Sequence, residues 1–242
     1  MNRIFLLIAL IGSVALTPSR APATEAGRPI RIMPLGDSIT EARNGQASYR
    51  YWLWGELIAH GYDVDFVGSR QGVFEGRPRY DDFDPDHEGH WGWHADEVLD
   101  QVADWTRKGR PDVVLIHLGT NDLGSGEHPA NTLNDLCQII KTLQGENPDV
   151  TVLLAKLIPA VGIDVEAAAA LNKAIAALAG RRNIPASRVV AVDMTAGFDV
   201  GDDTYDGLHP NEAGEKKMAG HWLAALQEVL GPPPGRLSSP GF

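Results

Sequence analysis

Short apolar runs alternate with helical patterns along most of this chain. Helical spacing between apolar positions predicts helices over 51–60 and 95–108, and further helices around 133–143, 171–178 and 218–229. Apolar runs typical of strands occupy 30–35, 64–67, 113–118, 150–158 and 189–192. The segment 69–93 is instead polar and rich in glycine, so we expect it to form a long loop.

This order of elements predicts the fold class. Five strands that are each followed by a helical segment indicate a parallel sheet with helices on both faces, a three-layer αβα sandwich of the α/β class. The run 113–118 is apolar throughout, as expected of a strand covered on both sides. The composition does not break between 24 and 230 and no repeat is present, so we expect one domain over 24–230.

The two ends of the chain differ from this domain. Residues 1–23 resemble a signal peptide, with Arg3 at the start, an apolar run over 4–16 and Ala-Pro-Ala at 21–23 as the cleavage site. The apolar run has 13 residues, whereas a membrane span takes about 20, so we expect cleavage. This predicts a secreted or periplasmic protein without a membrane segment after cleavage. The tail 231–242 is rich in Pro, Gly and Ser, and we expect it to be disordered.

Composition and charge exclude several classes of protein. Over 242 residues, 43% are hydrophobic and 22% are charged, which is ordinary for a globular domain. The formal net charge of −11 argues against nucleic acid and anionic lipid as partners. Cys137 is the single cysteine, so the chain cannot form an internal disulfide or a cysteine-based zinc site. The oligomeric state stays open.

Polar, glycine-containing segments follow four of the predicted strands. Because the carboxyl ends of parallel strands gather at one edge of a sheet, we expect these segments to lie close together. They are Gly36-Asp37-Ser38, Gly68, Gly119-Thr120-Asn121-Asp122 and Asp206-Gly207-Leu208-His209.

Three of these residues suit nucleophilic catalysis. The hydroxyl of Ser38 needs a base to take its proton, and the imidazole of His209 titrates near neutrality. Asp206 lies three residues before His209, so one short loop can present both side chains toward the serine. In this arrangement Asp206 fixes the tautomer of His209.

Such a reaction also needs donors for the oxyanion that it forms. The backbone N–H groups of Ser38 and Gly68 and the side-chain amide of Asn121 can supply three. Each of these segments taken alone also fits a structural role, since a strand-end Gly-Asp-Ser commonly caps a helix. Their joint occurrence at the strand ends favours catalysis.

These segments, with Ile39 and Pro210 beside them, resemble the four sequence blocks of the SGNH (GDSL-type) hydrolase superfamily over residues 30–230. The resemblance implies a Ser-His-Asp acyl-enzyme mechanism with Ser38 as nucleophile, His209 as base and Asp206 as its orienting group. It implies an oxyanion hole of Ser38, Gly68 and Asn121, and a flavodoxin-like strand order 2-1-3-4-5. Ile39 stands where the family has Leu, which is a small change.

A narrower resemblance concerns residues 31–40, 49–50, 64–69 and 86–93, which are similar to carbohydrate esterase family 3. Members of that family remove acetyl groups from xylan, so the resemblance implies acetylated carbohydrate as substrate. The family has Pro where Trp91 stands. We expect the substrate to contact Asp37 and His90, with Trp91 and Trp93 as apolar platforms for sugar rings.

Residues 81–94 also suggest a metal site, because they are dense in Asp, Glu and His. The calcium-loop template fails from Asp82, since its sixth position is His87 and its twelfth is Trp93. The zinc-protease pattern HExxH is absent as well. We therefore expect no catalytic metal and no cofactor, while a structural calcium ion stays open. His117 lies in an apolar run and is expected to be a core histidine beside the site.

Two other functions compete with a carbohydrate esterase. A lipase or thioesterase of the same superfamily would need an apolar groove for its acyl chain, whereas the segment 69–93 is polar. A non-catalytic carbohydrate-binding protein would not need all the catalytic positions. The α/β-hydrolase fold needs G-x-S-x-G, which this serine lacks, and phosphate-binding glycine motifs are missing too.

Overall fold

The computed structural model describes residues 27–233, so the predicted signal peptide over 1–23 lies outside the described residues, as does the predicted tail beyond 233. The strands are β1 (Ile30–Gly36), β2 (Val64–Phe66), β3 (Arg70–Gln71), β4 (Asp86–Gly89), β5 (Val113–His117), β6 (Thr151–Ala155) and β7 (Val189–Val192). The helices are α1 (Ser38–Glu41), α2 (Ser48–Ala59), α3 (Ala95–Gly109), α4 (Thr120–Gly124), α5 (Pro129–Glu146), α6 (Val165–Arg182), α7 (Val200–Asp203) and α8 (Glu212–Leu230).

The five predicted strands form a parallel sheet in the order β2-β1-β5-β6-β7. The predicted strands 1 to 5 correspond to β1, β2, β5, β6 and β7. Their order in the sheet is therefore the expected 2-1-3-4-5, and the fold class and the order are confirmed. In this sheet β1 lies inside, with β5 on one edge and β2 on the other.

The predicted count of five strands is wrong, because the segment 69–93 holds two more. Strand β4 pairs in parallel with the second half of β1, on the edge whose first half pairs with β2. The short β3 pairs with β4 in antiparallel fashion. Strand β4 reads Asp-His-Glu-Gly, so no apolar run marks it. Its His87 and Glu88 are nevertheless buried, and polar neighbours rather than apolar packing hold them.

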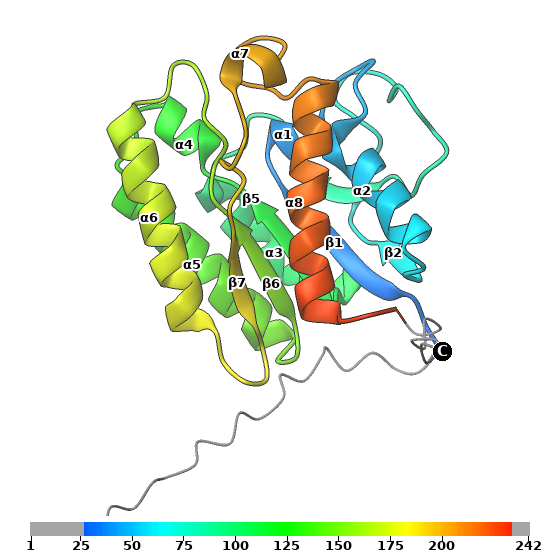
Figure 1. Ribbon diagram of the computed structural model, residues 1–242. Coiled ribbons are helices and arrows are strands. Elements are labelled where there is room, and N and C mark those ends of the chain that lie inside the picture. The colour runs from blue at the N-terminus through cyan, green and yellow to red at the C-terminus, as the bar shows by residue number, and fades with distance from the viewer. Residues whose placement is uncertain (1–26, 234–242) are drawn as a thin grey trace, which may run out of the picture.

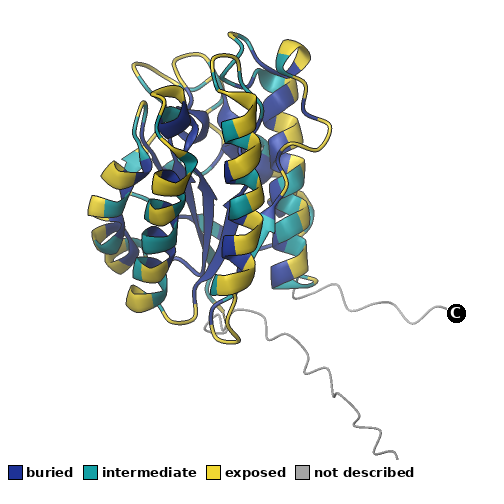
Figure 2. Ribbon diagram, turned by 90° about the vertical axis from the view of Figure 1, so that its left-hand side faces the viewer, coloured by how far each residue is buried: buried dark blue, intermediate teal, exposed yellow. Residues whose placement is uncertain are grey.

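Helices cover both faces of the sheet, as Figure 1 shows. Helices α2 and α8 pack on one face, while α3, α5 and α6 pack on the other. Successive side chains of a strand point to opposite faces, so Ile32 joins the core under α2 and α8, whereas Met33 and Leu35 join the other core. Figure 2 shows the helices exposed on their outer surfaces and the sheet buried between them.

Two polar residues fix the ends of loops that matter for the site. Asp37 begins α1, and its carboxylate accepts a hydrogen bond from the backbone N–H of Ile39. Asn211 begins α8 in the same way, and its amide also donates to the carbonyls of Asp202 and Thr204. Asn211 thereby holds both ends of the segment that carries Asp206 and His209.

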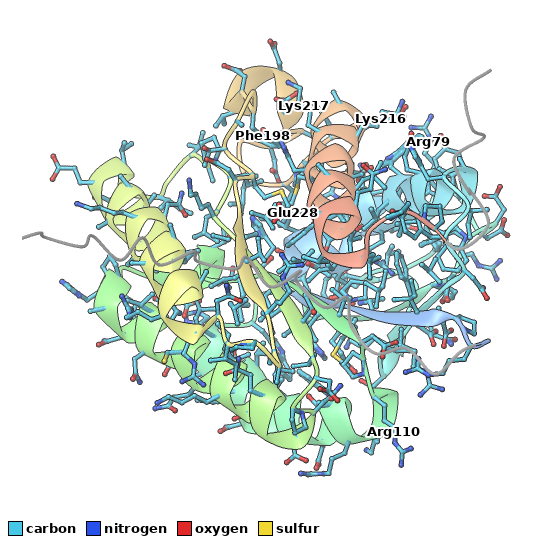
Figure 3. All side chains as sticks on the ribbon, turned by 60° about the horizontal axis from the view of Figure 1, so that its bottom comes forward. Arg79, Arg110, Phe198, Lys216, Lys217 and Glu228 are labelled. Carbon is cyan, nitrogen blue, oxygen red and sulfur yellow. The ribbon has the colours of Figure 1, made fainter. Side chains whose placement is uncertain are left out.

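The long segment between β3 and β4 is tied down at two places. The guanidinium of Arg50 is fully buried and donates to the carbonyls of Gly72 and Pro85, as well as to α1. On the outside, Arg79 and Lys216 both bind Glu212 at the start of α8, and Figure 3 shows the two side chains near one another. Within residues 27–233, no helix combines the length and the apolar character that crossing a membrane would take.

Candidate active site

The short helices α1, α4 and α7 lie along the upper edge of the sheet in Figure 1, where the parallel strands end. Ser38 is the first residue of α1 and follows β1 almost directly. Gly36 makes this sharp turn feasible, since a Cβ there would lie 2.4 Å from both the carbonyl oxygen of His117 and the hydroxyl of Thr40.

The three residues expected to form a triad lie in one hydrogen-bonded chain. The Nε2 atom of His209 lies 2.9 Å from the Oγ of Ser38, and its Nδ1 atom lies 2.8 Å from the Oδ2 of Asp206. The second carboxylate oxygen of Asp206 accepts the N–H groups of Leu208 and His209. Partial burial would raise the pKa of Asp206, but these hydrogen bonds and the nearby imidazole hold it below its usual value. Asp206 is thus an ionised acceptor that can fix the imidazole and face a positive charge on it.

Asn121 lies at the same edge, in the first turn of α4. Its side-chain nitrogen donates one hydrogen bond to the carbonyl of Trp93, at 2.8 Å. An amide carries two N–H bonds, so this contact orients the group and leaves the second N–H for another acceptor. The geometry is compatible with the expected role of Asn121 as an oxyanion donor.

The structure does not bring Gly68 to the serine. In the β1–β2 register Phe66 pairs with Ile32, so Gly68 stops short of the level of Gly36. Gly36 pairs instead with Gly89 of β4. Gly68 faces the backbone of His87 and lines a separate cavity with Trp105.

Gly92 is the better placed glycine, and the sequence reasoning missed it. It lies between Trp91, whose ring stacks on His209, and Trp93, whose carbonyl holds Asn121. Its φ of +79° is a conformation that favours glycine, and within residues 27–233 its N–H has no hydrogen-bond partner. This preference for glycine after β4 is visible only once β4 is known to be a strand.

Asp37 cannot contact a substrate directly, so the prediction of a substrate-binding role is wrong. Its side chain is fully buried beneath α1. Burial, with the neighbouring charge of Asp122 adding to it, raises the pKa of Asp37 to about 7, although the N–H of Ile39 opposes the shift. One of its oxygens has no partner within the described residues, and the same holds for Thr120 Oγ1 and Asp122 Oδ2.

His90 is also buried, at 5% exposure, which contradicts its expected contact with substrate. Its Nε2 atom lies 3.1 Å from the Oε2 of Glu88, and its ring is stacked on Trp93 and on Trp105 at centroid distances of 4.2 and 4.7 Å. Trp93 is half-buried and gives one face to His90. These residues form a packed support under the segment that carries Gly92.

Trp91 reaches the triad. Its ring stacks on the imidazole of His209, with 4.7 Å between the ring centroids. Phe74 stacks on the same ring, at 4.8 Å. Trp91 is thus engaged by two neighbouring rings, and its stacking on a sugar ring stays a prediction.

Glu41 is a further residue that sequence reasoning missed. Its side chain is buried at the end of α1, where one oxygen accepts the N–H of Trp91 at 2.6 Å and the other binds Arg70. Glu41 therefore holds the segment around Trp91, after β4, close to α1, which carries Ser38. Its sequence context, Ser-Ile-Thr-Glu, resembles that of any acidic residue in a first helical turn, so no sequence signal marks this role.

Within residues 27–233, one group of side chains has the composition of a metal site: His94, Asp122 and Glu127, with their ligand atoms within 4.8 Å of one another. One oxygen of Asp122 already accepts the N–H of Ala95. The acidic run after Asp81 does not take part. His117 is fully buried, as expected, and burial lowers its pKa to about 4.

A small pocket opens beside Ser38 and His209. Ile39, Ala42 and Met218 supply apolar walls, and Tyr205 closes one side. Its free space is about 10 Å³, which is room for roughly one water molecule. Any acyl group that enters it has to be small.

The fold and these contacts define a class of protein, the three-layer αβα proteins that carry a hydrogen-bonded serine, histidine and aspartate at the strand ends. Residues 35–217 match the family described as "GDSL-like Lipase/Acylhydrolase family". The chain belongs to this family, which places it among the carboxylic ester hydrolases.

Two solved structures and one further protein are similar in sequence to most of this chain. A carbohydrate esterase family 3 protein from Talaromyces cellulolyticus is 32% identical, with a TM-score of 0.75 over 83% of this chain and 98% of that one. A family 3 carbohydrate esterase from Clostridium thermocellum is 33% identical, with a TM-score of 0.71 over 84% and 98%. A multidomain esterase of Ruminococcus flavefaciens is 29% identical over 91% of this chain, which spans 31% of that protein's length.

Proposed function

We propose that this chain removes acetyl groups from an acetylated carbohydrate, such as acetylated xylan, through an acyl-enzyme formed on Ser38. The observation that carries the proposal is the continuous hydrogen-bonded chain from Ser38 through His209 to Asp206. Its position at the strand ends, in a member of an acylhydrolase family, supports the assignment. The likeness to family 3 carbohydrate esterases supports acetylated carbohydrate as the substrate.

In the first half of the reaction, the Oγ of Ser38 attacks the acetyl carbonyl carbon while its proton passes to the Nε2 of His209. Asp206 holds the imidazole and faces the positive charge that the ring acquires. The tetrahedral intermediate then breaks its bond to the sugar oxygen, which takes the proton from His209. In the second half, water repeats this attack on the acetyl-enzyme and releases acetate.

The negative oxygen of the tetrahedral intermediate needs donors that are already in place. We assign this role to the backbone N–H groups of Ser38 and Gly92 and to the free N–H of Asn121. Gly92 replaces Gly68 in this assignment, because its N–H is unpaired within the described residues and lies between Trp91 and Trp93.

The surroundings of the serine support a short acyl group and a polar leaving group. The pocket of about 10 Å³ beside Ser38 suits an acetyl methyl group, but not a fatty acyl chain. An open cleft of about 400 Å³ lies next to Trp91, between Arg43, Asn44 and Glu75. These side chains can hydrogen-bond to hydroxyl groups, which favours a carbohydrate over a lipid. Export to the periplasm or the medium, where polysaccharide is found, belongs to the same proposal.

A panel of esters tests this function directly. We expect acetate release from acetylated xylan and acetylated monosaccharides, and a steep loss of kcat/KM from 4-nitrophenyl acetate to butyrate and octanoate, because the pocket is small. Ser38→Ala removes the attacking oxygen and should abolish the activity while leaving the melting temperature close to that of the parent. Rates that rise toward octanoate would favour a lipase. Wild-type turnover by Ser38→Ala would refute the mechanism.

A further inference from the structure

Two aromatic rings stack on the imidazole of His209. The ring of Trp91 lies 4.7 Å from it with an interplanar angle of 15°, and the ring of Tyr205 lies 5.7 Å from it at 11°. Within the described part of the chain, the rings of Trp91 and Tyr205 do not contact each other. Each ring is nearly parallel to the imidazole, so both stack on it.

Both rings have further partners. Phe74 stacks on Trp91 at 4.8 Å and 16°, and the guanidinium of Arg43 lies 4.9 Å from the ring centre of Tyr205. The backbone N–H of Trp91 donates a hydrogen bond to Glu41. The two rings that stack on the imidazole are therefore themselves held by neighbours.

We propose that Trp91 and Tyr205 are positioning residues, which hold the plane of the His209 ring and stabilise the positive charge that it carries during ester hydrolysis. This inference rests on the proposed function of the same site, in which His209 takes the proton of Ser38. Trp91 thereby serves the catalytic histidine.

The need for such positioning follows from how a histidine ring moves. The imidazole turns about its Cβ–Cγ bond, and both of its hydrogen bonds, from Nδ1 to Asp206 and from Nε2 to Ser38, depend on the angle at which it stops. A fixed aromatic ring stacked on the imidazole limits this rotation. The negative faces of the rings also attract the imidazolium.

The charged groups around the imidazole set the direction of the effect. Asp206 favours the cation directly. Glu41, beside Trp91, is paired with Arg70, so its charge is balanced. Glu215 lines the pocket beside His209, but burial raises the pKa of its carboxyl. Arg43, over the ring of Tyr205, opposes the effect of Asp206. Tyr205 itself stays neutral, because burial, reinforced by the charge of Asp206, raises the pKa of its hydroxyl to about 12. Because the ring of Tyr205 already interacts with the guanidinium of Arg43, we expect Trp91 to stabilise the imidazolium more than Tyr205 does.

Trp91 and Tyr205 together form what we call the clamp. Replacement of either residue tests the proposal, with 4-nitrophenyl acetate as substrate. Trp91→Leu removes one aromatic face and should lower kcat about threefold to thirtyfold. It should also move the acidic limb of the kcat/KM profile to lower pH by about half a unit to one unit. Trp91→Phe restores a ring and should recover most of both changes. Tyr205→Leu should move the limb in the same direction by less.

Tyr80→Leu is the matched control, because Tyr80 belongs to the same long segment and stacks on Tyr51 instead, at 4.3 Å. It should leave the rate and the limb unchanged. If Trp91→Leu lowers the rate with an unmoved limb, and Trp91→Phe does not restore it, Trp91 only orders its segment and the proposal is wrong.

A second readout does not depend on turnover. The titration of the His209 ring can be followed by NMR in protein that carries Ser38→Ala, with and without Trp91→Leu. We expect the titration midpoint to fall when the Trp91 ring is removed, and equal midpoints would overturn the clamp. If the wild-type protein hydrolyses no ester, the proposed function fails, while this NMR comparison still tests the clamp.

Discussion

At the scale of single residues, two aspartates near the serine show that surroundings decide the role of a carboxylate. Hydrogen bonds from Leu208 and His209 hold the pKa of Asp206 below its usual value, despite partial burial. Burial instead raises the pKa of Asp37 to about 7, and its second oxygen has no hydrogen-bond partner within the described residues. The first carboxylate can face an imidazolium ion. The second contributes to the architecture under α1.

Replacing Asp206 by Asn should keep the shape of its loop but remove the negative charge. The remaining oxygen can still accept the backbone N–H groups of Leu208 and His209. The amide facing Nδ1 favours the wrong tautomer, so we expect kcat to fall by about 10²- to 10⁴-fold. The acidic limb of kcat/KM should move to lower pH, because the imidazolium loses its partner. A pH series with 4-nitrophenyl acetate measures both effects.

Asp202→Asn is the control for this change, since Asp202 lies in α7 on the same loop region and is exposed. It should behave like the parent. If Asp206→Asn kept the parental rate and limb, Asp206 would not be the orienting carboxylate.

Replacing Asn121 by Ala should affect the transition state more than substrate binding. Its free N–H is assigned to an oxygen that becomes negative only during the reaction, so the loss appears mainly in kcat, at about 10²- to 10³-fold. Initial rates over a range of substrate concentrations separate kcat from KM. A raised KM with an unchanged kcat would make Asn121 a substrate-binding residue instead.

At the scale of elements, β4 explains why the site was only partly predictable. The five strands with apolar runs could be read from the sequence, since each buries side chains against a helix layer. In β4 the buried side chains are His87 and Glu88, and the partners of Glu88 are Ser69 and His90. Polar burial of this kind depends on partners outside the strand, Ser69 before β3 and His90 after β4, which a local sequence pattern does not indicate. The error about Gly68 follows from missing β4.

The close approach of β4 to α1 predicts a sharp response at Gly89. A Cβ on Gly89 would lie 2.5 Å from the backbone nitrogen of Glu41, and backbone cannot yield as a side chain can. Gly89→Ala should therefore lower the free energy of unfolding by about 1–3 kcal/mol and reduce activity, since it displaces β4 from α1. Urea unfolding and ester hydrolysis measure the two losses.

Gly55→Ala is the matched control, because Gly55 lies inside α2 and an added Cβ meets nothing within 4 Å. Alanine favours a helix interior by about 0.5–1 kcal/mol, so this variant should be slightly more stable and fully active. Equal stabilities of the two variants would mean that β4 can move away from α1 at little cost.

At the scale of the whole molecule, the sequence predicts where the chemistry gathers more reliably than which side chains touch the substrate. The strand-end rule brought Ser38, Asn121 and His209 to one edge without any knowledge of contacts. Whether the ring of Trp91 contacts a sugar or a histidine depends on the path of the segment 72–91. Buried Arg50 and Glu41, which lie far from this segment in the sequence, fix the path by direct hydrogen bonds. That path is a property of the folded molecule.

The folded molecule also buries groups whose titration couples stability to pH in opposite directions. Burial lowers the pKa of His117 to about 4 from 6.5, so His117 stays neutral in the fold where the unfolded chain is charged. Its contribution to stability is therefore lost as pH falls from 6.5 toward 4. Asp37 acts in the reverse sense, because its folded pKa of about 7 lies above the 3.8 of the unfolded chain.

Asp37→Asn isolates this second contribution. As pH rises from 4 to 7, the unfolded chain releases the proton of Asp37 while the folded chain keeps it, so the wild-type free energy of unfolding loses on the order of 4 kcal/mol from this group. Asparagine does not titrate and can still accept the N–H of Ile39. The stability of the variant relative to wild type should therefore grow by several kcal/mol between pH 4 and 7. The contribution of His117 is common to both proteins and cancels in this difference. Urea unfolding at a series of pH values measures it, and a difference that stays constant would mean that Asp37 is ionised in the fold throughout this range.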